Sequence, residues 1–275
     1  MNLELNNKLH GFVLEQIKDI EDAKGTLYMF RHEQTNAELC WLKRDDNNKT
    51  FAITFKTIPD NDTGVFHILE HSVLNGSKKY PVREPFVELL KSSLQTFLNA
   101  FTYPDKTMYP VSSRNDKDYM NLISVYMDAV FQPAIYTNPN IFLQEGWHYQ
   151  IHDVNKEMEY SGVVLNEMKG AFSSVDETIV DELNRMLFPD NCYKYVSGGD
   201  PRYITDLTYE KFIETHQKFY HPSNARIWVD GNLDIDEVLR FIHEEYFVDY
   251  QKEEMDFAIP MQKVLPAVHN RISYE

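Results

Sequence analysis

The stretch GVFHILEHSVLNG, residues 64–76, places two histidines and an acid at spacings that are meaningful in a helix. An α-helix turns by about 100° and rises about 1.5 Å per residue, so His67 and His71 lie one turn apart on nearly the same face. Two imidazoles placed in this way can bind one metal ion together. Glu70 lies beside them and can reach a water on that metal without being a ligand. We expect Thr63 to cap this helix and Asn75-Gly76 to end it.

A catalytic zinc commonly takes three protein ligands and keeps a fourth position open, and this helix supplies only two. We expect the third ligand to be Glu167, because it lies on another helical stretch where the small residue Gly170 allows close approach. Spacing alone leaves Glu157, Glu159 and Glu177 open as alternatives.

The order H-x-x-E-H is the mirror of the H-E-x-x-H pattern of zinc peptidases. Zinc lowers the pKa of water toward about 7, and Glu70 can accept the released proton and deliver it to a leaving amine. The pattern therefore predicts peptide-bond hydrolysis without a covalent intermediate. Five residues can also match by chance, in which case His67 and His71 are ordinary helix side chains and Glu70 is a surface residue.

The composition of the 275 residues is that of a globular protein, with 43% hydrophobic residues, and the length suits one large domain or two small ones. The net charge of −16 and the absence of a basic stretch argue against nucleic acid or an anionic membrane surface as partners. The same charge would attract basic peptides, although an acidic balance also serves solubility alone.

The cysteines and the first residues indicate the compartment. Cys40 and Cys192 are far apart and form no C-x-x-C pair, so neither a disulfide framework nor a cysteine zinc site is expected. The N-terminal residues resemble neither a signal peptide nor a transit peptide, and no run approaches the length of a membrane span. We therefore expect a cytoplasmic, bacterial protein.

Strand and helix patterns are interleaved without strict repetition, which favours an α+β fold with a mixed, largely antiparallel sheet packed against helices. The early segments are expected to pair as an antiparallel meander, and two more strands follow. The predicted strands are 26–30, 38–42, 51–55, 96–103, 107–111 and 225–229. The predicted helices begin near residues 83–85 and 161, the second continuing with a break to 187, and also cover 115–131, 208–219 and 235–242.

Several blocks together resemble the N-terminal catalytic domain of presequence-protease-like zinc metallopeptidases, within the pitrilysin and insulysin superfamily. They cover most of residues 20–235 in the family's order. The blocks are HILEH at 67–71, GSKKYP at 76–81, FLNAFT at 97–102, GVVLNEMKG at 162–170, SGGDP at 197–201 and YHPSNAR at 220–226. The resemblance implies zinc (Zn2+) held by His67, His71 and Glu167, with Glu70 as the general base.

The resemblance also gives a role to the strand around Asn99, Ala100 and Phe101. In similar enzymes this exposed edge strand pairs with the main chain of an extended substrate, which reads backbone rather than sequence. An ordinary edge strand is the alternative. One departure concerns a second acid that some relatives carry seven residues before the liganding glutamate, since Tyr160 occupies that position here.

Family members consist of two homologous halves that enclose a chamber, and the second half contributes substrate-binding Arg and Tyr residues. We therefore expect residues 1–258 to form a zinc-bearing peptidase domain and residues 259–275 to begin a linker. Unfolded peptides are the expected substrates, and the C-terminal half or a partner subunit is expected to be needed, so that the chain alone is weak or inactive. The alternative is a non-catalytic peptide-binding or scaffold domain, because the superfamily also contains domains that have lost the metal.

Overall fold

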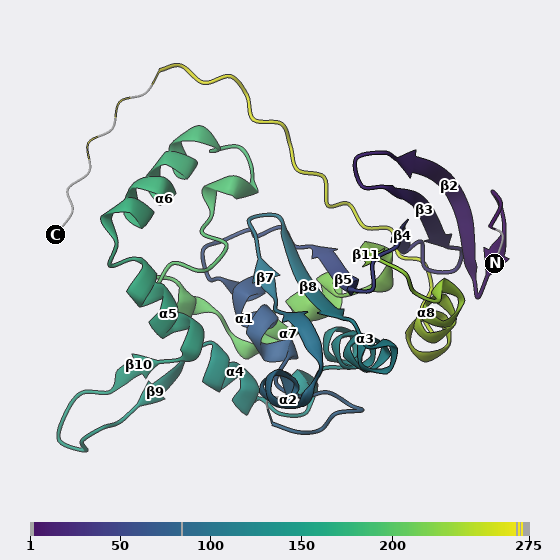
Figure 1. The fold of residues 1–275 in the computed structure, drawn as a ribbon. Helices are drawn as coiled ribbons and strands as arrows, with labels where there is room; N and C mark the ends of the chain where they lie inside the picture. Colours follow the sequence, from purple (N-terminus) through teal and green to yellow (C-terminus); the bar gives the residue numbers. More distant parts are fainter. Residues whose placement is uncertain (1–2, 84, 268, 270, 272–275) are drawn as a thin grey trace.

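The computed structural model describes residues 3–83, 85–267, 269 and 271, and its centre is a nine-stranded sheet (Figure 1). The strands are β1 (Lys8–Leu9), β2 (Phe12–Ile20), β3 (Gly25–His32), β4 (Glu38–Lys43), β5 (Lys49–Lys56), β6 (Gln95–Leu98), β7 (Phe101–Thr102), β8 (Lys106–Ser113) and β11 (Ala225–Asp230). Their order is β1-β2-β3-β4-β11-β5-β8-β6, with β7 pairing to β8 after β6. Only β4 and β11 are parallel among these described strands. The α+β fold with a mixed, largely antiparallel sheet is therefore confirmed.

The predicted meander of three early strands is wrong, because β11 lies between β4 and β5. Ile227 and Val229 are buried while Arg226 and Trp228 are exposed on the opposite face, so β11 has the alternating pattern of a half-buried strand. Such a pattern suits the middle of the sheet, and it does not reveal which strands will lie on either side.

The strand predicted over residues 96–103 is split in the structure. β6 ends at Leu98 and β7 begins at Phe101, which leaves Asn99 and Ala100 between two short edge strands. Within this break, the carbonyl oxygen of Asn99 accepts a hydrogen bond from the Tyr126 hydroxyl (3.2 Å).

Helices other than α6 (Val175–Leu187) pack against the sheet, and their buried or partly buried residues join those of the strands in a single core. The helices are α1 (Val65–Val73), α2 (Pro85–Ser92), α3 (Asp116–Phe131), α4 (Asn140–Glu145), α5 (Val163–Ala171), α6 (Val175–Leu187), α7 (Tyr209–Phe219) and α8 (Ile235–Ile242), with a π-helical turn at His243–Phe247. The long predicted helix after residue 161 breaks into α5 and α6. Of the predicted start near residues 83–85, Glu84 lies outside the described residues.

A separate hairpin, β9 (His148–Gln150) with β10 (Glu159–Ser161), projects from the body between α4 and α5 (Figure 1). Beyond the hairpin, α6 lies on the outside of the molecule, and none of its residues is buried. The extended segment after residue 250 runs toward α6, where the Gln262 amide donates to the carboxylate of Asp190 (2.9 Å).

The proposed domain boundary at residue 258 stays a prediction. Residues 259–267 of the expected linker contain no helix or strand, while residues 268, 270 and 272–275 lie outside the described part of the chain.

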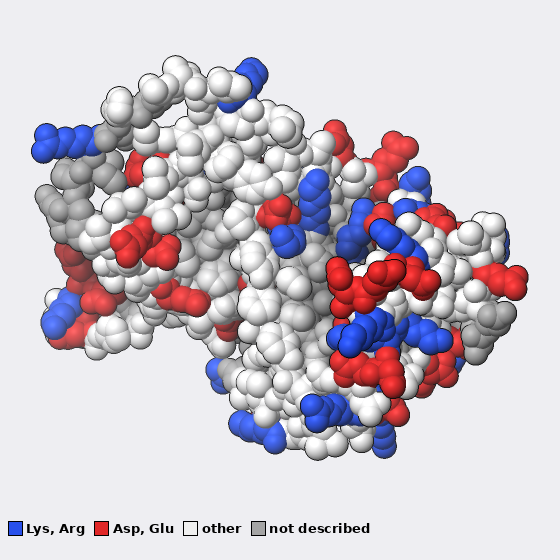
Figure 2. All heavy atoms as spheres, turned by 45° about the horizontal axis from the view of Figure 1, so that its top comes forward, with Lys and Arg blue, Asp and Glu red and all other residues white. Residues whose placement is uncertain are grey.

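Charged side chains are unevenly distributed over the face drawn in Figure 2. Acidic and basic groups are interspersed on the right-hand side of that view, where β1–β4 and α8 lie, and the centre of the face is largely uncharged. Within the described residues, none of the helices has the length and apolarity that crossing a bilayer requires.

Candidate metal centre

Helix α1 begins with a close contact to a distant loop, and the predicted Thr63 cap is wrong. The capping position is Gly64, whose φ of 66° is left-handed, and the Thr63 hydroxyl donates instead to the Asn61 side chain (2.6 Å). A β-carbon built on Gly64 would lie 2.6 Å from the α-carbon of Gly199. The start of α1 is therefore set by its packing against the loop around residue 199.

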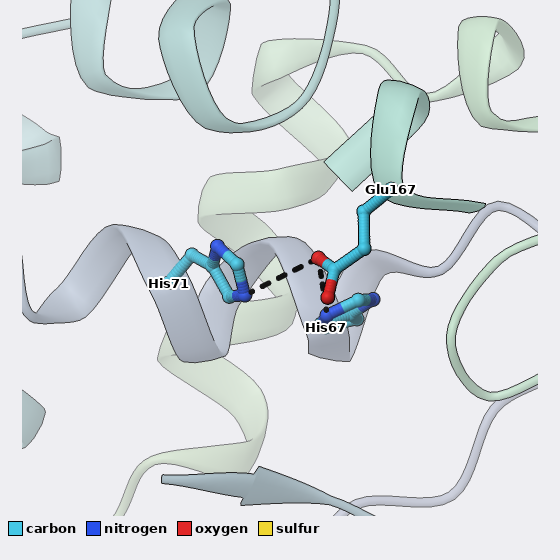
Figure 3. A group of neighbouring side chains, drawn as sticks. All are labelled: His67, His71 and Glu167. Atoms are coloured by element: carbon cyan, nitrogen blue, oxygen red, sulfur yellow. Dashed lines mark ion pairs between the residues drawn. The ribbon is translucent and has the colours of Figure 1, made fainter. Parts of the chain in front are cut away.

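His67 and His71 project from α1 toward Glu167 of α5 (Figure 3). The Nε2 atoms of the two histidines lie 3.6 Å and 3.8 Å, respectively, from Oε2 of Glu167. The three ligand atoms all lie within 4.8 Å of one another, and the described residues contain no other group of three His, Cys, Asp or Glu side chains this close. The geometry thus brings together the three residues predicted as ligands.

Among the described residues, none of the alternative acids forms an ion pair with these two histidines. Glu159 lies on β10 against His152, with 3.9 Å between carboxylate and imidazole, while Glu157 and Glu177 are exposed on the hairpin and on α6. His148 uses Nδ1 for a hydrogen bond to the carbonyl of Leu143 (2.7 Å).

The predicted close approach at Gly170 is wrong, because a β-carbon on Gly170 would meet no atom within 4 Å. The close approach occurs at the start of α5 instead. A β-carbon on Gly162 would lie 2.0 Å from the carbonyl oxygen of Gly146, which directly follows α4. Two glycines therefore let the end of α4 contact the start of the helix that carries Glu167.

Both histidines have their second ring nitrogen in a hydrogen bond. Nδ1 of His67 lies 2.9 Å from the carbonyl oxygen of Gly198, and Nδ1 of His71 lies 3.2 Å from the carboxylate of Glu145. A carbonyl and a carboxylate only accept hydrogen bonds, so Nδ1 is the donor in each ring. In the neutral rings, Nε2 is then left with a free lone pair that faces Glu167.

Glu145 is not among the residues predicted from the sequence. It is buried at the end of α4, and its other oxygen accepts from the Asn75 amide (3.0 Å) and the Gln144 amide (2.9 Å). A carboxylate held in this way orients the ring of His71. The feature of the sequence that could have identified Glu145 is its place on the same face of α4 as the apolar residues Ile141 and Phe142. Tyr160, at the position of the second acid in some relatives, is exposed on β10.

Two family models match the chain: insulinase, peptidase family M16, over residues 58–174, and the M16 inactive domain over residues 206–274. The chain is 53% identical over 263 residues to protein HypA of Clostridium perfringens, and 50% identical over 234 residues to presequence protease 1, chloroplastic/mitochondrial, of Arabidopsis thaliana. It is 42% identical over 265 residues to the mitochondrial presequence protease of Mus musculus. The chain belongs to the pitrilysin and insulysin superfamily.

The fold of the chain is similar to that of a known member of this superfamily. The crystal structure of pitrilysin aligns with 92% of the chain at a TM-score of 0.70 and 17% identity. The matches cover 96%, 85% and 95% of this chain but only 27%, 22% and 25% of the three relatives, respectively. The chain therefore spans about a quarter of the length of these superfamily members.

Glu70 is buried in α1 and lines a pocket of about 420 Å³. The pocket wall also contains His71, Asn99 and Ala100, so the structure brings two of the three predicted substrate-binding residues to the predicted base. Phe101 is not part of this wall. Its ring lies between those of Phe97 and Tyr103 along the sheet edge, with centroid distances of 6.4 Å and 6.1 Å.

The electrostatics of this superfamily site favour a cation. Burial lowers the pKa of His71, but the hydrogen bond to Glu145 and the negative charges of Glu70, Glu145 and Glu167 raise it more, so that the net pKa lies above the ordinary value. Two imidazoles and one carboxylate form the donor set of a catalytic zinc site, and both imidazoles are already oriented for it. The residues present therefore fit a zinc ion.

Proposed function

We propose that this chain is the zinc-bearing catalytic domain of a metalloendopeptidase that hydrolyses short unfolded peptides. The observation that carries the proposal is the convergence of His67, His71 and Glu167, with buried Glu70 on the wall of the adjoining pocket. Membership of a peptidase superfamily supports it.

In this proposal His67, His71 and Glu167 hold the metal, which when bound supplies a Lewis acid and lowers the pKa of water. Glu70 accepts the proton of the attacking water and returns it to the nitrogen of the leaving amine. Gly198 and Glu145 keep the two imidazoles in the orientation that ligation requires.

The substrate main chain is assigned to the sheet edge formed by β6 and β7. The N–H groups of Asn99 and Tyr103 point inward to the carbonyls of Pro110 and Lys106, at 3.2 Å and 2.8 Å. Strand alternation then directs the N–H groups of Ala100 and Thr102 outward, where an extended peptide can pair with them. The side chain of Asn99 accepts from Ala100 N–H (2.9 Å) and occupies the position of a substrate carbonyl until it is displaced.

Further groups that close over the substrate are assigned to a C-terminal half or a partner subunit, because the relatives are about four times longer than the chain. A cytoplasmic location stays a prediction, since two relatives are named as mitochondrial or chloroplastic proteins.

A non-catalytic domain is the second candidate function, on the basis of the match of residues 206–274 to the M16 inactive domain. All four candidate catalytic and metal residues precede that segment.

The test measures zinc content and hydrolysis of an unstructured fluorogenic peptide. It compares the full-length protein, meaning this chain together with the C-terminal half or partner subunit assigned above, with its Glu70→Gln variant. We expect a single zinc in both proteins and a loss of rate of at least about 100-fold in the variant. Glu177→Gln, an exposed acid on α6, is the matched control and is expected to keep the rate. Rates that survive Glu70→Gln would overturn the assigned base, and zinc binding without hydrolysis by the wild-type protein would favour the non-catalytic domain.

A further inference from the structure

The loop from Val196 to Asp200 contacts both helices that carry the candidate ligands. On the α1 side, the carbonyl of Gly198 accepts the hydrogen bond from Nδ1 of His67 (2.9 Å). On the α5 side, a β-carbon built on Gly198 would lie 2.9 Å from the sulfur of Met168, the residue after Glu167. A shift of this loop would therefore move the acceptor that orients His67.

Asp62, three residues before the first residue of α1, holds both ends of this loop. Its carboxylate accepts from the N–H of Val196 (2.8 Å), and its backbone carbonyl accepts from the N–H of Asp200 (2.9 Å). Asp62 therefore adds two hydrogen bonds to the contacts that Gly64 and His67 make with this loop.

Arg185 of α6 in turn holds the carboxylate of Asp62. Two guanidinium nitrogens donate to its two oxygens at 3.1 Å and 3.2 Å, a bidentate pair with fixed geometry. The same guanidinium donates through Nε to Asp181 (3.1 Å) and lies 3.8 Å from the fully buried carboxylate of Asp200. Three carboxylates therefore converge on one arginine, with Arg202 as a second partner of Asp200.

We propose that Arg185 is a positioning residue of the metal centre, acting on His67 through Asp62 and the carbonyl of Gly198. The inference rests on the zinc centre proposed above. No residue of α6 is buried, so apolar packing alone does not place this arginine, and its contacts with Asp62 and Asp200 connect the outer helix to the loop. When the bidentate pair between Arg185 and Asp62 is lost, the loop relaxes and the ring of His67 loses its fixed orientation and tautomer.

The test measures zinc affinity in the full-length protein by competition with a chromophoric chelator, at a temperature well below unfolding of every variant. We expect Arg185→Gln to bind zinc about tenfold more weakly than the wild type, as for other partners that orient metal ligands. Arg185→Lys keeps the positive charge but cannot form the bidentate pair with Asp62. The zinc affinity of this variant should therefore lie between those of the wild type and Arg185→Gln. The matched control is Arg240→Gln, which removes another arginine–carboxylate pair at i,i+4 spacing and should leave the affinity unchanged.

A coupled pathway also makes a prediction about the double variant. Asp62→Asn still offers an oxygen to the N–H of Val196 but loses the negative charge. If the two residues act in one pathway, the double variant Asp62→Asn/Arg185→Gln should bind zinc no more weakly than the weaker-binding of the two single variants. The visible spectrum of bound Co²⁺ should change in Arg185→Gln, because the environment of His67 changes.

Equal zinc affinity of Arg185→Gln and the wild type would overturn the inference, even if Arg185→Gln melts at a lower temperature. Failure of the wild type itself to bind zinc would instead overturn the zinc centre on which the inference rests.

Discussion

The two candidate histidine ligands differ in the group that orients them. His67 donates to the backbone carbonyl of Gly198, whereas His71 donates to the buried carboxylate of Glu145. A carboxylate partner increases the basicity of an imidazole more strongly than a neutral carbonyl does. His71 is therefore the histidine whose ligand strength depends on a single side chain.

Replacement of Glu145 by Gln is expected to weaken zinc binding by about 10- to 100-fold, because the negative charge opposite Nδ1 of His71 is lost. Chelator competition with the folded full-length protein measures the effect. Glu157→Gln, on the exposed hairpin, removes an acid of the same type and should leave the affinity unchanged. Equal affinities for the two variants would contradict the role of Glu145.

At this scale the helix period predicted the shared face of His67 and His71, because i,i+4 spacing determines it. Glu167 was one of four candidate acids, and no local rule separates them, since the contact between α4 and α5 that places it is made by residues distant in the sequence. The same holds for Glu145, which belongs to no motif. Thr63 was expected as a cap because capping rules are local, whereas the start of α1 depends on Gly199.

At the scale of elements, β6 and β7 form the last edge of the sheet among the described strands, and both pair with β8 on their inner side. The edge carries the partly exposed aromatic rings of Phe97 and Tyr103. An edge with outward N–H groups and apolar side chains suits pairing with an extended peptide.

Thr102→Pro removes an outward N–H while leaving the inward ladder intact, and proline is tolerated on edge strands. If the substrate pairs here, the KM for peptides should rise by about three- to tenfold, the value of one hydrogen bond, with little change in kcat. Thr102→Val is the matched control, because it keeps the N–H and loses only the hydroxyl, which contacts the carbonyl of Phe66 (3.4 Å). Indistinguishable KM values in the two variants would argue against pairing at this edge.

Periodicity predicted individual elements better than their neighbours. α3 and α8 match the predicted helices within a residue, and the Thr208 side chain caps α7 by accepting from Lys211 N–H (3.2 Å). These features are encoded within a few turns of chain. The place of β11 between β4 and β5 is encoded only by long-range packing, so the sequence pattern indicated a strand but not its partners.

At the scale of the whole molecule, a histidine pair connects the N-terminal strands to the turn that follows α8. His32 is buried, with Nδ1 2.9 Å from the Thr35 hydroxyl and Nε2 3.0 Å from Nδ1 of His243. Burial and the neighbouring His243 lower the pKa of His32 to about 4, against a small opposing effect of Glu33. The folded protein therefore keeps His32 neutral at pH values where the unfolded chain is protonated.

This difference predicts acid-sensitive stability. The pKa of His32 is about 4 when folded and near 6.5 when unfolded, so unfolding takes up a proton between these values. Its contribution is fully present above pH 6.5 and falls as the pH drops toward 4, by a total on the order of 3 kcal/mol. Urea unfolding from about pH 7.5 to about pH 4.5 should show a shallower pH dependence for His32→Gln than for the wild type. His152→Gln, an exposed histidine, should keep the wild-type slope, and an unchanged slope in His32→Gln would contradict the prediction.

The position of β11 also determines when the sheet can be completed during synthesis. β4 and β5 leave the ribosome early, but the strand that separates them ends at Asp230, so two apolar strands must wait for most of the chain. Pairing between such distant segments slows folding and leaves strand edges open to wrong partners. Nascent chains that stop before residue 230 should therefore be the ones that need chaperones most and aggregate most readily.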